Sequence, residues 1–77
     1  MELDIELDKD LDFEGYIDHF VAQGFKLAKD ANERGFRVAS LRLYTPEDYG
    51  EVMLRQRDGD TKVSVMLSMN GRVVPFA

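Results

Sequence analysis

The chain has 77 residues, of which 44% are apolar and 32% are charged, and its formal net charge is −5. This size and composition indicate one ordinary globular domain, residues 1–77, and exclude a disordered chain. The absence of cysteine excludes disulfide scaffolds, zinc ribbons and thiol catalysis, and a single histidine excludes metal sites built from paired imidazoles.

Targeting signals are absent from the sequence as it stands. No apolar run approaches the ~20 residues of a membrane span. The first residues, Met-Glu-Leu-Asp-Ile-Glu, have neither the basic region nor the apolar region of a signal peptide. We therefore expect a cytoplasmic protein that acts on no membrane.

Acidic residues are concentrated at the start of the chain. Residues 1–18 carry eight acids against Lys9, a net charge of −7, whereas residues 19–77 carry seven acids against nine bases, a net charge of +2. A basic footprint for nucleic acid is missing, so we expect no direct binding to DNA or RNA. The eight acids are Glu2, Asp4, Glu6, Asp8, Asp10, Asp12, Glu14 and Asp18.

The first predicted element is a strand in residues 1–8. Leu3, Ile5 and Leu7 alternate with acids, and this period of two is typical of a strand with one face on a core and one in water. Asp12 is then a suitable N-cap for a helix, and Glu14 lies in the first helical turn, where the helix dipole favours an anion.

The second predicted element is a helix over residues 13–34, which ends near Gly35. Gly24 lies on the buried stripe of this helix, where glycine costs about 1 kcal/mol relative to alanine. Either the helix backbone approaches a sheet closely at that turn, or the helix breaks there. The stripe consists of Phe13, Tyr16, Ile17, Phe20, Leu27, Ala28 and Ala31.

The third predicted element is a strand over residues 36–44. Its apolar residues change parity, because Phe36 and Val38 share one face while Leu41 and Leu43 share the other. A β-bulge near residues 39–40 would bring all four to one face.

Two predictions compete for the segment that follows. Thr45-Pro46 is typical of a helix start, which favours a second helix over residues 46–57. Alternatively, a turn leads into a strand over residues 51–57. The strand is favoured because it places apolar residues opposite apolar residues in the two hairpins described next.

The first of these hairpins is predicted at Asp58-Gly59. If this pair forms a two-residue type I′ turn, Leu54 faces Val63. By the same rule, Val52 faces Val65.

The second hairpin is predicted at Asn70-Gly71, which places Leu67 opposite Val74 and residue 65 opposite Phe76. A slip of one residue in either hairpin would turn the apolar residues to the wrong face. The shared apolar face consists of Val52, Leu54, Val63, Val65, Leu67, Met69, Val74 and Phe76.

Together these elements predict a two-layer α+β fold. We expect an antiparallel sheet of four or five strands, with a meander in residues 51–77, and one long α-helix (about residues 13–34) packed on one face.

The acidic row at the start of the chain is the main candidate site. Residues i and i+2 of a strand project from one face about 6.6–6.8 Å apart, which is of the order of the charge spacing along a nucleic-acid strand. Such a row can act as a polyanion surrogate in the basic groove of a DNA- or RNA-handling protein. Alternatively, it is a solvated strand face that protects a sheet edge. It does not make a calcium loop, because Phe13 stands where glycine is needed.

Two tyrosines extend the candidate site. Tyr44 and Tyr49 flank the Thr-Pro-Glu-Asp turn and are either a contact point for a partner or a lid over the sheet edge. His19 has no evident nucleophile or pocket beside it, so we expect no enzymatic activity, no metal and no cofactor. The predicted partner-binding residues are Glu2, Asp4, Glu6, Asp8, Asp10, Asp12, Glu14, Tyr44 and Tyr49.

A short pattern resembles a known family. Tyr44, seven mostly polar residues, then Val52-Met53-Leu54 and a further hairpin is similar to the layout of phage uracil-DNA glycosylase inhibitors, which are small acidic DNA mimics. The resemblance covers residues 44–54 and the plan of acidic strand, helix and antiparallel sheet. This chain lacks that family's N-terminal helix. The resemblance implies an inhibitor function.

Two functions are therefore expected. The first is a non-catalytic protein-binding module, an inhibitor of a nucleic-acid-handling protein of the type that viruses and mobile elements direct against host defences. The alternative is a structural or assembly subunit that forms a homo-oligomer, a homodimer for example, through its sheet face and edges.

Overall fold

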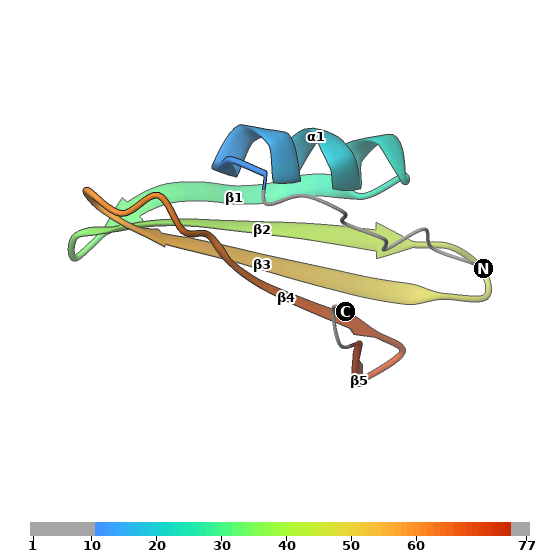
Figure 1. Ribbon diagram of the computed structural model, residues 1–77. Coiled ribbons are helices and arrows are strands. Elements are labelled where there is room, and N and C mark those ends of the chain that lie inside the picture. Colours follow the sequence, from blue (N-terminus) through green and yellow to red (C-terminus); the bar gives the residue numbers. More distant parts are fainter. Residues whose placement is uncertain (1–10, 75–77) are drawn as a thin grey trace.

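The computed structural model describes residues 11–74. One helix lies across one face of a five-stranded sheet, which gives two layers (Figure 1). The strands are antiparallel and follow the chain order β1-β2-β3-β4-β5. The predicted strand at residues 1–8 and the predicted pairing of Phe76 lie outside the described residues. The elements are α1 (Phe13–Ala22), β1 (Lys26–Glu33), β2 (Phe36–Tyr44), β3 (Tyr49–Arg57), β4 (Ser64–Met69) and β5 (Arg72–Val74).

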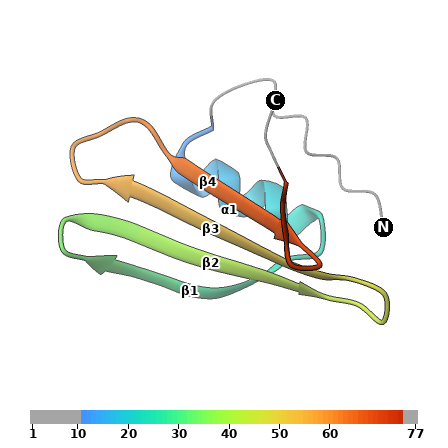
Figure 2. The same ribbon diagram turned by 90° about the horizontal axis from the view of Figure 1, so that it is seen from below.

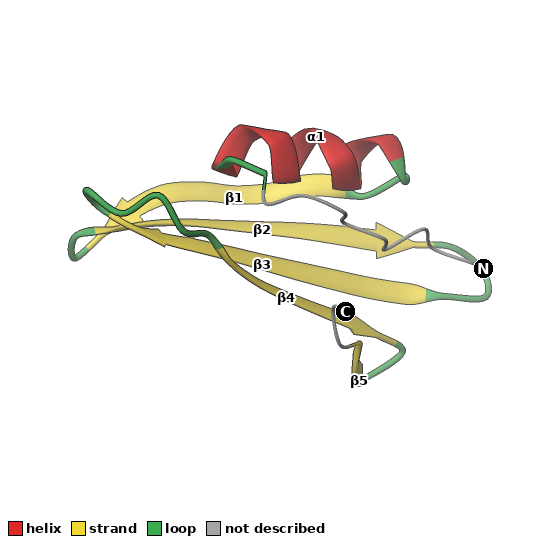
Figure 3. Cartoon of the chain, in the orientation of Figure 1, coloured by secondary structure: helices red, strands yellow, loops and turns green. Residues whose placement is uncertain are grey.

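The predicted fold class is confirmed. Residues 11–74 form a small α+β fold with one antiparallel sheet and a single packed helix (Figure 3). The core lies between α1 and the inner face of the sheet. Among residues 11–74, eleven apolar residues are buried there: Phe13, Tyr16, Ile17, Phe20, Phe25, Ala39, Leu41, Leu43, Val52, Leu54 and Leu67.

The predicted length of the helix is wrong. The helix ends at Ala22, and residues 26–33 form the edge strand β1. Gly24 has a φ of 102°, a conformation that glycine adopts freely and that ends the helix. The chain then turns so that Phe25 enters the core, whereas Leu27 of the predicted stripe is 47% exposed. Of the two possibilities considered at Gly24, the helix break is the one observed.

The predicted bulge in residues 36–44 is also wrong. β2 pairs with β3 without interruption, and the register shift lies in the neighbouring strand β1, between Leu27 and Lys29. Phe36 and Val38 therefore project to the outer face of the sheet, opposite to the helix. Their parity differs from that of the core residues because they belong to a different surface.

The strand in the segment after residue 45 is confirmed, and it begins earlier than predicted, at Tyr49. Thr45 and Pro46 begin a tight turn and not a helix. The Thr45 hydroxyl oxygen accepts hydrogen bonds from the backbone N–H groups of Glu47 and Asp48, at 3.2 and 2.8 Å. The side-chain chemistry that caps helices thus closes the β2–β3 hairpin here.

The register of the first predicted hairpin is wrong by two residues. Leu54 pairs with Val65, and residues 58–63 form a longer connection than the predicted two-residue turn. The apolar face is nevertheless the predicted one, because a slip of two residues leaves each side chain on the same side. The partly buried residues packed against the core include Val63, Val65, Met69 and Val74.

The second hairpin is confirmed within the described residues. Leu67 pairs with Val74. Asn70 and Gly71 have φ values of 53° and 81°, as a type I′ turn requires. In residues 11–74 no helix is both long enough and apolar enough to cross a membrane.

Candidate partner-binding surfaces

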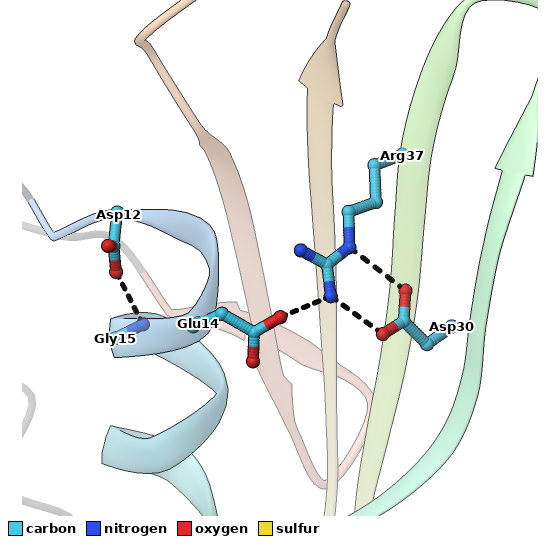
Figure 4. A network of polar contacts seen from close by, with 5 residues as sticks. All are labelled: Asp12, Glu14, Gly15, Asp30 and Arg37. Carbon is cyan, nitrogen blue, oxygen red and sulfur yellow. Dashed lines mark hydrogen bonds and ion pairs between the residues drawn. The ribbon is translucent and has the colours of Figure 1, made fainter.

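Most of the predicted acidic site lies outside the described residues: Glu2, Asp4, Glu6, Asp8 and Asp10. Two of its members, Asp12 and Glu14, are described, and both support the fold. The Asp12 carboxylate accepts a hydrogen bond from the backbone N–H of Gly15 at 2.7 Å, which confirms the predicted N-cap (Figure 4).

Glu14 is part of a junction between three elements (Figure 4). Arg37 on β2 donates one hydrogen bond to Glu14 on α1 and two to Asp30 on β1, the latter at 3.1 and 2.8 Å. Its guanidinium also lies 4.2 Å from the centre of the Phe13 ring. The Glu14 carboxylate therefore helps to hold the helix on the sheet, a role that the sequence alone did not indicate.

Electrostatics at this junction follow from the same contacts. The hydrogen bonds from Arg37 hold the pKa of Asp30 below its ordinary value, and those to Asp30 and Glu14 raise the pKa of Arg37. Asp30 and Arg37 are therefore both charged at neutral pH.

The structure brings the two predicted tyrosines together. Tyr44 and Tyr49 are directly opposite across the β2–β3 hairpin, and their ring centres are 5.1 Å apart. The Tyr49 hydroxyl donates to the Glu51 carboxylate at 3.1 Å, and this bond raises the pKa of Tyr49. Tyr44 is 68% exposed. Both side chains lie on the outer face of the sheet, where their role as a partner contact stays a prediction.

The outer face of the sheet is the face that α1 does not cover (Figure 2). Cross-strand pairing places apolar and charged side chains on it together. Its strand residues include five bases and two acids, so this face has a net charge of +3. The charged residues are Lys26, Lys29, Arg42, Arg55, Arg57, Glu33 and Glu51. The larger apolar and aromatic residues are Phe36, Val38, Tyr44, Tyr49, Met53, Met66 and Val73.

One end of this outer face is hollowed. Arg55 lies over the ring of Phe36, 3.9 Å from the ring centre. Beside the pair is a shallow hollow of ≈ 350 Å³, which we call the Arg55 hollow. The sequence did not indicate this hollow, because its lining comes from β2, β3, the connection to β4 and the first residue of β4. The lining residues are Phe36, Arg55, Arg57, Asp60, Lys62, Val63 and Ser64.

His19 lies on α1 beside the ring of Phe20, with the ring centres 5.1 Å apart. Its Nε2 atom is buried without a hydrogen-bond partner. Among the described residues there is no group of three or more side chains that could hold a metal ion. No protein-family model, no curated protein and no solved structure matches this chain.

Proposed function

We propose that this chain is a small, non-catalytic protein-binding module that works in the cytoplasm as an inhibitor of a nucleic-acid-handling protein. The observation that carries the proposal is a separation of charge. Residues 11–74 have ten acids and nine bases, a net charge of −1, whereas residues 1–10 have five acids and one base, a net charge of −4. The acidic excess therefore belongs to one short segment at the start of the sequence, residues 1–10.

Acids of the described part are largely engaged in the fold, which supports this assignment. Asp12 caps the helix, and Glu14 and Asp30 bind Arg37. On the outer face, Glu33 pairs with a lysine and a second glutamate pairs with an arginine. The acids that a partner would meet as a row are then Glu2, Asp4, Glu6, Asp8 and Asp10.

A row of carboxylates is complementary to a groove that binds phosphates. It steers a basic partner toward the complex and competes with nucleic acid for the same cations. Viruses and mobile elements would gain from such an inhibitor because it blocks a host protein without needing a reaction. Tyr44 and Tyr49 would add an aromatic contact from the outer face of the sheet.

The test uses the heparin-retained fraction of a cell lysate, which is enriched in nucleic-acid-handling proteins. The tagged protein should retain a specific partner at low salt, lose it at high salt, and release it when duplex DNA is added. The variant Glu2→Lys/Asp4→Lys/Glu6→Lys should retain none. The control Asp18→Lys/Glu47→Lys/Asp58→Lys has the same net charge and should behave as the unaltered protein. Equal retention by both variants, or no effect of DNA, would contradict the proposal.

A second candidate function is a structural or assembly subunit that forms a homo-oligomer through its outer sheet face. The observation that favours it is the exposure of large apolar side chains on that face. Tyr44 and Val73 are each 68% exposed, and Met66 is 57% exposed. Sedimentation velocity over a range of protein concentrations tests it, and a monomer at every concentration would exclude it.

A further inference from the structure

The lining of the Arg55 hollow has more positive than negative charge. Arg55, Arg57 and Lys62 line it together with one acid, Asp60, so its lining has a net charge of +2. The three cationic side chains make no ion pair with any residue of the described range 11–74. Elsewhere in the sheet, Lys29, Arg37 and Arg42 each have a carboxylate partner. Lys26 and Arg72 have no ion pair within residues 11–74, but they do not lie together. The hollow is therefore distinguished by gathering three such cations in one place.

Its lining is also apolar. The Phe36 ring lies under Arg55, and Val63 forms part of the wall. A neighbouring hollow of ≈ 390 Å³ shares Phe36 and Arg55 and adds Val38 and Met53. An occupant that satisfies both hollows must bring carboxylates for the cations and aliphatic side chains for the apolar wall.

This combination favours a protein segment over a nucleic acid. The aromatic ring of the lining, Phe36, already has Arg55 over it, the side chains of Val38, Met53 and Val63 are aliphatic, and the lining has acids of its own, Glu33 and Asp60. An acidic segment with alternating aliphatic residues has the required chemistry. The chain itself contains one, since Leu3, Ile5 and Leu7 alternate with acids within its first eight residues.

We propose that the Arg55 hollow binds the acidic residues 2–8 of a second copy of this chain, in a reciprocal dimer. Each copy would contribute one acidic segment and one basic hollow, so a two-fold axis satisfies both at once. This inference rests on the second candidate function and deepens it, and it competes with the inhibitor proposal because both use the acidic residues 2–8. Direct packing of two outer faces would place like charges together, which disfavours it.

The acidic segment comes from the other copy because of where the helix lies. Leu11 packs against the core between α1 and the inner face of the sheet. The hollow is on the opposite face, so residues 2–8 of the same copy would have to pass around a sheet edge. A second copy presents them to the hollow without this detour.

Two charge-reversal variants test the proposal. The first variant, Arg55→Glu/Arg57→Glu, has an acidic hollow and an acidic segment. The second, Glu2→Lys/Asp4→Lys/Glu6→Lys, has a basic hollow and a basic segment. In sedimentation velocity at low salt, each variant alone should dimerise at least tenfold more weakly than the unaltered protein. An equimolar mixture of the two should recover a one-to-one dimer, because each hollow then meets a segment of opposite charge.

The matched control is Lys26→Glu/Arg72→Glu, which changes the charge by the same amount as the first variant at exposed positions away from the hollow. It should dimerise as the unaltered protein does. A synthetic peptide of residues 1–10, titrated into the second variant, should bind, and titrated into the first it should not. The peptide result does not depend on self-association of the variants.

Three outcomes would overturn the inference. If neither variant changes the strength of the dimer, the second candidate function remains, but the Arg55 hollow is not its contact site. Two variants that weaken the dimer singly but do not associate when mixed would exclude an exchange between copies. An unaltered protein that is monomeric at every concentration would overturn the inference and the second candidate function together.

Discussion

Arg37 covers the ring of Phe13, with its guanidinium carbon 4.2 Å from the ring centre, where α1 meets the sheet. The outer face has a similar pair, Arg55 over Phe36 at 3.9 Å. The two differ in their surroundings. Arg37 is held by two carboxylates, whereas Arg55 has no ion pair within residues 11–74. The first pair joins the helix to the sheet, and the second lies beside the Arg55 hollow.

Arg37→Leu should lower the stability of the fold. The change removes two ion pairs and a cation–π contact but keeps an apolar cover on Phe13, so we expect a loss of about 1–2 kcal/mol. Arg42→Leu is the matched control, because Arg42 is half exposed and its single partner, Glu51, is 3.6 Å away. It should cost less than ~0.5 kcal/mol. Urea denaturation measures both, and equal losses would contradict the role of Arg37.

The Asp30 carboxylate should make stability depend on pH. Its pKa in the folded state is lowered, mainly by the hydrogen bonds from Arg37. Its contribution is therefore present above the unfolded pKa of about 3.9 and is lost as the pH falls through the folded pKa.

The corresponding measurement compares Asp30→Asn with the unaltered protein. The variant should be less stable at pH 7, and the difference in urea midpoint should shrink steadily below pH ~4. Asp18→Asn, at an exposed position of α1, is the control for the substitution itself. A difference that stays constant down to pH ~2 would show that charge is not the cause.

Gly24→Ala distinguishes the observed helix end from a continuous helix by the sign of its effect. Within a helix, alanine would stabilise the protein by about 1 kcal/mol relative to glycine. At a φ of 102°, alanine is strained, and its Cβ would also lie 3.4 Å from the side chain of Leu43. We expect a lower melting temperature. A higher one would mean that the helix continues through residue 24.

Gly71→Val should strain the Asn70-Gly71 turn. Gly71 has a φ of 81°, which a β-branched residue adopts at a cost of about 1–3 kcal/mol. Each 1 kcal/mol lowers the melting temperature of a domain of this size by roughly 4–8 °C. Gly71→Asn should lose less, because asparagine tolerates this conformation. An unchanged melting temperature for the valine variant would contradict the type I′ assignment.

Local chemistry determined what the sequence predicted correctly. Asp12 caps the helix because an aspartate before an apolar stripe satisfies a free backbone N–H. Asn70-Gly71 forms its turn because both residues accept a positive φ. The buried face of β3 and β4 was predicted from alternation together with the two turn signals, and Val52, Leu54 and Leu67 are fully buried on it.

For the candidate site, sequence patterns were a weaker guide. They identified Tyr44 and Tyr49, which do meet, but the Arg55 hollow was not predicted. Arg55 and Arg57 share a face because they are two residues apart on β3. What the sequence did not show is that Phe36 lies beside them, which depends on the uninterrupted pairing of β2 with β3.

Tertiary packing decided the end of the helix and the register of the first hairpin. The spacing of Leu27 and Ala28 fits a helical stripe, but the sheet gains an edge strand if the chain reverses at Gly24 and buries Phe25. The register of Leu54 was ambiguous because pairings two residues apart expose the same face. Only the full set of cross-strand contacts selects Val65 as its partner. The pattern along one strand shows which side chains share a face. The choice between registers that keep the same face depends on contacts between strands.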